Sequence, residues 1–253
     1  MEFLPPDVDM LAASLLAGMS FVGGFFTAAM GIGGGVMLIA VMATLMPAAA
    51  VIPVHGVVQI GSNAARAVLQ RAHIDWKTSL YFFLGSIIGV AIGGSIFVTL
   101  PTDILKGGLA LFILYTVWGP KLKFVSDGYL SVSLIGLIAS FLTMFFGATG
   151  VFIAGLMNQR GYTPRQFVGT HSVCMGLQHV LKIVVFGLLG FAFADWLGVI
   201  AMMLIGGMTG TFLGSLLLNR LPAAMFKKGL KVILTLLALN LLVTAFGLYN
   251  LTL

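Results

Sequence analysis

One apolar stretch of the chain carries polar side chains on a single helical face. Their spacings of four, seven, eight and eleven residues keep them within a narrow arc at 3.6 residues per turn. This first polar stripe consists of His55, Gln59, Ser62, Asn63 and Arg66. An imidazole, two amides and a guanidinium offer N–H donors and positive charge. The chemistry that such a face favours is the binding of a small anion.

A second polar stripe repeats the pattern further along the chain. It consists of His171, Gln178, His179 and Lys182, with Met175 at the place of Gln59. Ionisable groups inside a membrane are expensive to bury and are functional candidates by default. The alternatives are that Arg66 and Lys182 extend to lipid headgroups, and that the imidazoles and amides form hydrogen bonds between helices.

No carboxylate accompanies either stripe. The chain has seven acidic residues, all in expected tails, loops or segment ends: Glu2, Asp7, Asp9, Asp75, Asp103, Asp127 and Asp195. A cation carrier normally needs an acidic group inside the membrane. The negative charge that balances Arg66 and Lys182 is therefore expected to arrive with the ligand.

Two glycine-rich breaks precede the stripes, GIGGG at 31–35 and GATG at 147–150. Glycine allows a helix to start inside the membrane, where its positive N-terminal end favours anions. We expect the breaks to contribute Gly33, Gly34, Thr149 and Gly150 to substrate binding, with close helix packing as the alternative. The G-x-x-x-G spacings at 85–93 and 206–214 are interpreted instead as packing sites.

The segments that position these residues are membrane helices. The chain is 60% hydrophobic and 8% charged, with a mean hydropathy of +1.12. Residues 10–65 form 56 positions without Asp, Glu, Lys or Arg, far beyond the ~20 that one crossing needs. Continuous apolar runs favour helices over a β-barrel. The N-terminal segment lacks a basic region, so the first helix is expected to be retained.

The chain matches itself in two registers. An offset of 116 pairs Gly31 with Gly147, His55 with His171 and Arg66 with Lys182. An offset of 121 pairs glycines 85, 89 and 93 with glycines 206, 210 and 214, so the second copy has five extra residues between about 183 and 205. The sequence pattern of each copy predicts the same series of elements: a helix, a break, a short helix, a polar-striped helix, a glycine-spaced helix and a closing helix. The copies are 1–123 and 124–253, within one integrated membrane domain.

Orientation follows from Lys and Arg in short loops, which favour the cytoplasm. The expected cytoplasmic loops are 71–77, 121–127, 160–165 and 219–222. The copies then have inverted topology, a feature of secondary transporters, and both termini are periplasmic. The fold class is an all-α polytopic membrane protein with two inverted-topology repeats and 8–10 transmembrane helices, some broken or re-entrant. Residues 11–46 form either two short crossings or one crossing with a re-entrant dip.

The sequence resembles the sulfite exporter TauE/SafE family, also described as sulfonate uptake permeases. The resemblance is carried by PVHGVVQIGSNAARAVL after GIGGG, and by YTPRQFVGTHSV after GATG. It extends to LGSIIGVAIGG and its partner IGGMTGTFLGSLL, and covers almost the entire chain. The resemblance implies two related halves and transport of sulfite, organosulfonates or related sulfur anions.

The function expected is secondary transport of a small sulfur-containing oxyanion across the bacterial inner membrane by alternating access. An anion channel would use the same stripes, and a membrane-embedded enzyme is a third hypothesis. No zinc-protease motif, nucleophile elbow or nucleotide-binding signature is present, and no enzyme, metal site or cofactor is predicted. Expected partners are the anionic substrate and lipid, with protons a candidate coupling ion, a homodimer a candidate assembly, and no nucleic acid.

Overall fold

The computed structural model describes residues 4–30, 33–97, 100–120, 128–217 and 223–246, with backbone alone at 223–230. The predictions for Gly31 and Ile32 of the first break, for the loops at 121–127 and 218–222, and for the two ends of the chain lie outside the described residues.

The described residues form ten α-helices and two single turns of 3-10 helix, without any strand. The α-helices are α1 (Met10–Met30), α2 (Gly34–Leu45), α3 (Ala48–Leu69), α4 (Trp76–Phe97), α5 (Thr102–Trp118), α6 (Tyr129–Phe146), α7 (Gly150–Gln159), α8 (Pro164–Leu188), α9 (Leu197–Leu216) and α10 (Ala223–Ala245). Five segments are long and apolar enough to cross a membrane: α1, α4, α6, α8 and 193–216. The predicted all-α, polytopic membrane fold is thereby confirmed.

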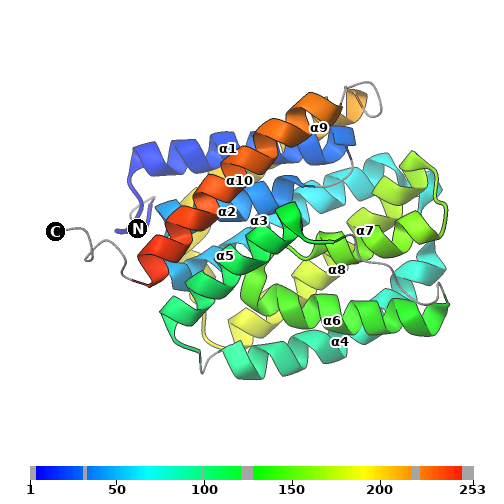
Figure 1. Ribbon diagram of the computed structural model, residues 1–253, viewed down its shortest axis with the longest axis horizontal. Helices are drawn as coiled ribbons and strands as arrows, with labels where there is room; N and C mark the ends of the chain where they lie inside the picture. The colour runs from blue at the N-terminus through cyan, green and yellow to red at the C-terminus, as the bar shows by residue number, and fades with distance from the viewer. Residues whose placement is uncertain (1–3, 31–32, 98–99, 121–127, 218–222, 247–253) are drawn as a thin grey trace.

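Two pairs of helices form opposite sides of the molecule. α1 packs along α9 and α4 along α6, while α3 and α8 run between these pairs (Figure 1). Glycines allow the backbones to touch. On α9 and α1 the facing residues are Gly206 with Ala17, Gly210 with Phe21 and Gly214 with Phe25. On α4 and α6 they are Gly85 with Ser133, Gly89 with Leu137 and Gly93 with Phe141. In each pair the residue numbers of the two helices rise in the same direction, so the helices are parallel. The packing interpretation of these glycines is confirmed.

The two polar-striped helices, α3 and α8, run antiparallel. Three contacts define their register: Gly56 lies beside Lys182, Asn63 beside Gly176, and Gln70 beside Gly169. Along the helix pair the residue numbers of α3 rise while those of α8 fall, so the two helices are antiparallel. The end of α3 therefore meets the start of α8, and the start of α3 meets the end of α8.

Helix boundaries follow the two registers of the sequence. α2 begins at Gly34 and α7 at Gly150, which are 116 residues apart. α4 begins at Trp76 and α9 at Leu197, which are 121 residues apart. The difference between the two offsets, five residues, arises in two places. α8 has 25 residues where α3 has 22, and the connection 189–196 has eight where 70–75 has six.

The glycine breaks end one helix and start another inside the protein. Gly33 has a φ of 109° and Gly147 a φ of 71°, a region that glycine enters without steric cost. At the first break the Thr27 hydroxyl accepts the Gly34 N–H at 2.9 Å. At the second, the Thr143 hydroxyl donates to the Gly147 carbonyl at 3.1 Å. One threonine on the helix before each break thus holds the turn.

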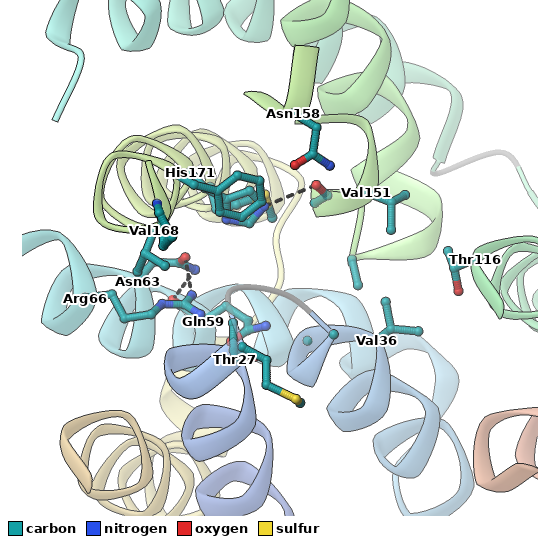
Figure 2. Close-up of a pocket in the computed structure, with 18 of the residues that line it drawn as sticks. Thr27, Val36, Gln59, Asn63, Arg66, Thr116, Val151, Asn158, Val168 and His171 are labelled. Atoms are coloured by element: carbon teal, nitrogen blue, oxygen red, sulfur yellow. Dashed lines mark hydrogen bonds between the residues drawn. The ribbon is translucent and has the colours of Figure 1, made fainter. Parts of the chain in front are cut away.

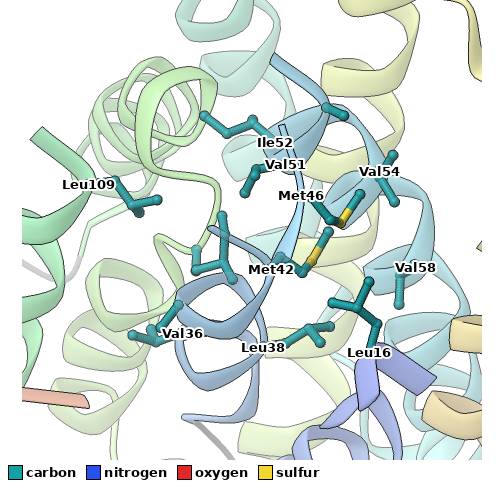
Figure 3. Close-up of a cluster of buried hydrophobic side chains, with 14 of the residues drawn as sticks. Leu16, Val36, Leu38, Met42, Met46, Val51, Ile52, Val54, Val58 and Leu109 are labelled. Carbon is teal, nitrogen blue, oxygen red and sulfur yellow. The ribbon is translucent and has the colours of Figure 1, made fainter. Parts of the chain in front are cut away.

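The short helix α2 is enclosed by protein. Its 12 residues rise only about 18 Å, too little for a hydrocarbon core of about 30 Å. It is apolar all round because its side chains pack against α1 and the start of α3 in one buried cluster, which includes Met42, Leu16 and Val54 (Figure 3). The first helix pair therefore favours one crossing with a shorter buried helix.

Substituting Gly89 by Leu should destabilise the α4–α6 pair. A Cβ there would overlap the Leu137 carbonyl oxygen, and that oxygen belongs to a backbone that cannot move aside cheaply. We expect a loss of about 1–3 kcal/mol or more, seen as a lower unfolding temperature in detergent. Gly18→Leu is the control, because Gly18 is exposed on α1 with open space around it. Equal stability of the two variants would contradict the packing role.

Candidate functional site

A cavity of about 540 Å³ lies where the two broken helix pairs meet the end of α3 and the start of α8. Figure 2 shows Gln59, Arg66 and His171 arranged around this space, with Asn158 and Val151 facing them from α7. The polar lining residues are Thr27, Gln59, Asn63, Arg66, Thr116, Asn158, Tyr162, His171 and Lys231. The volume accommodates a small oxyanion together with water.

Arg66 is the buried cation of this cavity. Its side chain is 4% exposed, and its Nη2 donates to Asn63 Oδ1 at 2.6 Å. Its Nε and Nη1 have no hydrogen-bond partner in the part of the chain that the structure describes. Asn63 in turn donates from Nδ2 to the Gln59 carbonyl at 2.7 Å, which fixes the amide that orients the guanidinium. Arg66 therefore presents N–H groups and a charge that a ligand can use.

His171 of α8 also lines the cavity and is tied to the second break. Its Nε2 lies 3.1 Å from the Gly150 carbonyl oxygen, at the first residue of α7. Phe167 stacks on its ring at 5.6 Å between centroids. Gly150 itself lines the cavity, and its lack of a side chain leaves room for the imidazole. The histidine is thus held in place by α7, with its ring edge at the cavity.

The predicted site residues divide into two groups. Those that line the cavity are Gly33, Gln59, Asn63, Arg66, Gly150 and His171. Those that do not are Gly34, His55, Thr149, Gln178, His179 and Lys182. Within the second group, Thr149 donates to Gln178 Oε1 at 3.2 Å and Gln178 donates to Ser140 at 3.0 Å. Gln178 thereby holds the second break against α6.

Further members of the second group are enclosed between α3, α8 and the second break. Lys182 is 0% exposed, and its Nζ donates to the Gly147 carbonyl at 3.3 Å. His55 accompanies it, with Nε2 3.1 Å from the Gly35 carbonyl oxygen. Gly34 packs against Gly23 of α1 and has no space for a side chain.

Five polar residues at the cavity were not predicted from the sequence: Thr27, Thr116, Asn158, Tyr162 and Lys231. Lys231 of α10 is exposed at the lining and lies with Nζ 4.8 Å from the centre of the Trp118 ring. Asn158 and Tyr162 contribute from α7 and the turn that follows it. Lys231 lies well inside α10, about one turn after two other lysines. A basic side chain inside an apolar helix was also the sequence feature that made Lys182 a candidate site residue.

A hydrogen-bonded cluster joins the α3–α4 and α7–α8 connections beside the cavity. Tyr162 donates to Asp75 Oδ2 at 2.5 Å, and the Thr78 hydroxyl donates to the same oxygen at 2.8 Å. Arg160 lies 3.9 Å from that oxygen and donates to Thr78 at 3.0 Å. Partial burial alone would raise the pKa of Asp75, but the Thr78 and Tyr162 donors and the Arg160 charge hold this pKa below its usual value.

The depressed pKa of Asp75 makes stability depend on pH. An ionised Asp75 contributes stability above the ordinary Asp pKa of about 3.9, and this contribution is lost as the pH falls through the lower folded-state pKa. Because solvent partly screens these charged hydrogen bonds, we expect Asp75→Asn to cost about 1–2 kcal/mol at pH 7. The difference from wild type should shrink below pH 4. Thermal unfolding in detergent from pH 7 to pH 3 measures it.

Asp7→Asn is the matched control, because Asp7 is an exposed acid near the N-terminus. A stability difference for Asp75→Asn that stays constant down to pH 3 would show that the carboxylate charge does not hold the two connections together.

The part of the cavity lining that the structure describes carries basic side chains without an acidic one. Asp and Glu are absent from its lining, and the ion pair between Arg160 and Asp75 is the one found among the described residues. Those residues also contain no group of three His, Cys, Asp or Glu side chains that could hold a metal. The available chemistry is hydrogen bonding and charge attraction from Arg66, Gln59 and His171.

Apolar helices of spanning length define a multi-pass membrane protein, and they surround a cavity lined by polar and apolar residues. The family model described as Sulfite exporter TauE/SafE matches residues 16–241. The chain belongs to this family, as the resemblance in the sequence indicated. No curated protein and no solved structure matches the chain significantly.

Proposed function

We propose that the protein is a secondary carrier that moves a small sulfur oxyanion, sulfite or an organosulfonate, across the bacterial inner membrane by alternating access. The observation that carries this proposal is the buried Arg66, whose Nε and Nη1 have no partner among the described residues and whose cavity contains no carboxylate. A buried guanidinium without a counter-charge is costly, and a bound oxyanion supplies the missing charge and acceptors.

The sulfur oxyanion would sit between the polar wall of α3 and the α7 break. The substrate-binding residues proposed in this cavity are Gly33, Gln59, Asn63, Arg66, Gly150 and His171. Sulfite and sulfonate groups present three oxygens on one sulfur, so several N–H donors can bind at once. Apolar lining such as Val36, Val151 and Met175 leaves room for the carbon chain of an organosulfonate.

The transport mechanism rests on two halves, 1–123 and 124–253, with inverted topology. The antiparallel course of the equivalent helices α3 and α8 supports the inversion, as do the equivalent parallel pairs α1–α9 and α4–α6. Exposed basic residues lie at the cavity end of the α3–α8 pair: Arg71 in the connection after α3, and Lys77 and Arg165 in the first turns of α4 and α8. By the positive-inside rule the cavity opens to the cytoplasm, with the termini periplasmic.

A carrier is favoured over a channel by what lies beyond the cavity. Towards the other end of the α3–α8 pair, Lys182 and His179 are 0% exposed. A channel would line this region with water, whereas a carrier closes one side while the other is open. Protons remain the proposed coupling ion, because the imidazole of His171 at the cavity is a group that can accept and release them during the cycle.

A binding screen tests the substrate class. Purified protein would be heated in detergent with sulfite, thiosulfate, sulfate, sulfoacetate or taurine, and chloride at equal ionic strength is the control. A ligand at 100 times its Kd stabilises the folded state by about 2.7 kcal/mol, so a substrate should raise the unfolding temperature visibly. Stabilisation by none of the sulfur anions would contradict the proposal.

A further inference from the structure

A second polar cluster lies outside the cavity and is sealed from solvent. It contains His55, His179 and Lys182, all 0% exposed, and the Nζ of Lys182 donates to the Gly147 carbonyl. The rings of His55 and His179 meet edge to face with centroids 5.8 Å apart. A Cβ built on Gly147 would lie 3.5 Å from His55 Nδ1, so the residue whose carbonyl holds Lys182 is adjacent to this histidine.

This cluster has hydrogen-bonding capacity that the described residues leave unused. His179 has no partner at either ring nitrogen, and His55 has none at Nδ1. Lys182 reaches one carbonyl oxygen at 3.3 Å, although an ammonium group can donate three hydrogen bonds. Buried polar groups are normally paired, so three unpartnered nitrogens beside a buried cation need an explanation.

The cluster repeats the polar wall of the cavity with the two halves exchanged. At an offset of 116, Arg66 corresponds to Lys182, Asn63 to His179 and His171 to His55. The cavity takes its cation and the neighbouring polar residue from α3 and its histidine from α8. The sealed cluster takes its cation and neighbour from α8 and its histidine from α3. In both, the histidine Nε2 lies 3.1 Å from a carbonyl oxygen in the first turn of the short helix after a break.

The antiparallel register separates the two polar sets along the helix pair. Arg66 and His171 lie near the end of α3 and the start of α8, where the cavity is. His55 lies about two turns after the start of α3 and Lys182 about two turns before the end of α8, where the chain is closed. One end of the helix pair is therefore open and the other is collapsed onto its own polar groups.

We propose that His55, His179 and Lys182 form a second anion site, closed in this structure, that binds the same small sulfur oxyanion when the Arg66 cavity is closed and the opposite side is open. The proposal rests on the proposed carrier function. The anion would replace the Gly147 carbonyl as the acceptor for Lys182 and use the free nitrogens of His179. Each membrane side then has its own cation at the site, Arg66 on one and Lys182 on the other.

Sidedness of transport tests the second site. Sulfite uptake would be measured in right-side-out and inside-out membrane vesicles for wild type, Arg66→Lys, Lys182→Arg and His179→Gln. We expect Lys182→Arg and His179→Gln to raise the KM for sulfite tenfold or more from one side only, and Arg66→Lys to raise it from the other. Lys77→Met, which removes an exposed charge, should change neither KM.

The outcomes separate the two proposals. A group that only supports the fold would lower the maximal rate from both sides without this mirrored change in KM. Wild-type uptake that saturates, with Lys182→Arg and His179→Gln altering KM equally from both sides or not at all, would overturn the second site and leave the carrier intact. Absence of saturable sulfite uptake in wild type would overturn both. His179→Gln keeps an N–H donor at similar size, so it serves if the bulkier Lys182→Arg fails to fold.

Discussion

Arg66→Met is expected to weaken binding of the sulfur oxyanion by roughly 10- to 150-fold without lowering the stability of the empty protein. A hydrogen bond from a charged group is worth about 1.5–3 kcal/mol, which corresponds to that loss of affinity. The empty protein should tolerate the change because Arg66 is a buried charge with no carboxylate partner among the described residues. Removing a buried charge that lacks a counter-charge also removes its desolvation cost.

Calorimetry in detergent measures the affinity, and thermal unfolding without ligand measures the stability. Arg66→Lys should fall between wild type and Arg66→Met, because it keeps the charge and loses the planar donors. Arg71→Met is the control, since Arg71 is exposed in the connection after α3. Unchanged affinity in Arg66→Met, or a strong loss of stability, would mean that Arg66 supports the fold and does not bind the anion.

Gly150→Leu is expected to reduce sulfite transport by roughly 100-fold while the protein still folds. A Cβ at this position would stand 3.0 Å from His171 Nε2, and the rest of the side chain would enter the cavity. Displacing a binding group such as the His171 imidazole by about 1 Å can lower the rate by about this factor. Uptake into proteoliposomes measures the effect, and gel filtration in detergent reports on folding.

Gly187→Leu is the matched control, because Gly187 lies on α8 away from the cavity with no atom closer than 3.9 Å to its Cβ position. Gly33→Leu is a less selective test than Gly150→Leu. Gly33 has a φ of 109°, so any side chain there strains the backbone as well as filling the cavity. Transport by Gly150→Leu at the wild-type rate would show that the second break only packs helices.

The fold could be predicted from the sequence because its strongest signals are local. Glycines spaced by four predicted the close packing of α4 and α9, and the breaks at Gly33 and Gly147 predicted where helices end. The offsets of 116 and 121 also predicted where the helices of the second copy begin, since the second copy repeats the elements of the first. The resemblance of the breaks and stripes to the TauE/SafE family agrees with the family match over 16–241.

The site could be predicted only in part. Helical periodicity shows which side chains share a face of a helix, but not how far along that helix the cavity extends. His55 and Arg66 share one face of α3, yet Arg66 lines the cavity and His55 lies in the sealed cluster. Gln178 also lies on the polar face of α8, but its amide is used by Thr149 and Ser140. Lys231 approaches the cavity from α10, and no repeated partner in the first copy pointed to it.

Counterflow of labelled sulfite in proteoliposomes tests the carrier most directly. Vesicles loaded with unlabelled sulfite should accumulate labelled sulfite transiently above its outside concentration, with a rate that saturates. Arg66→Met should lose this accumulation at concentrations that saturate wild type. A flux that rises linearly with sulfite and shows no counterflow, or equal counterflow in wild type and Arg66→Met, would contradict alternating access around the Arg66 cavity.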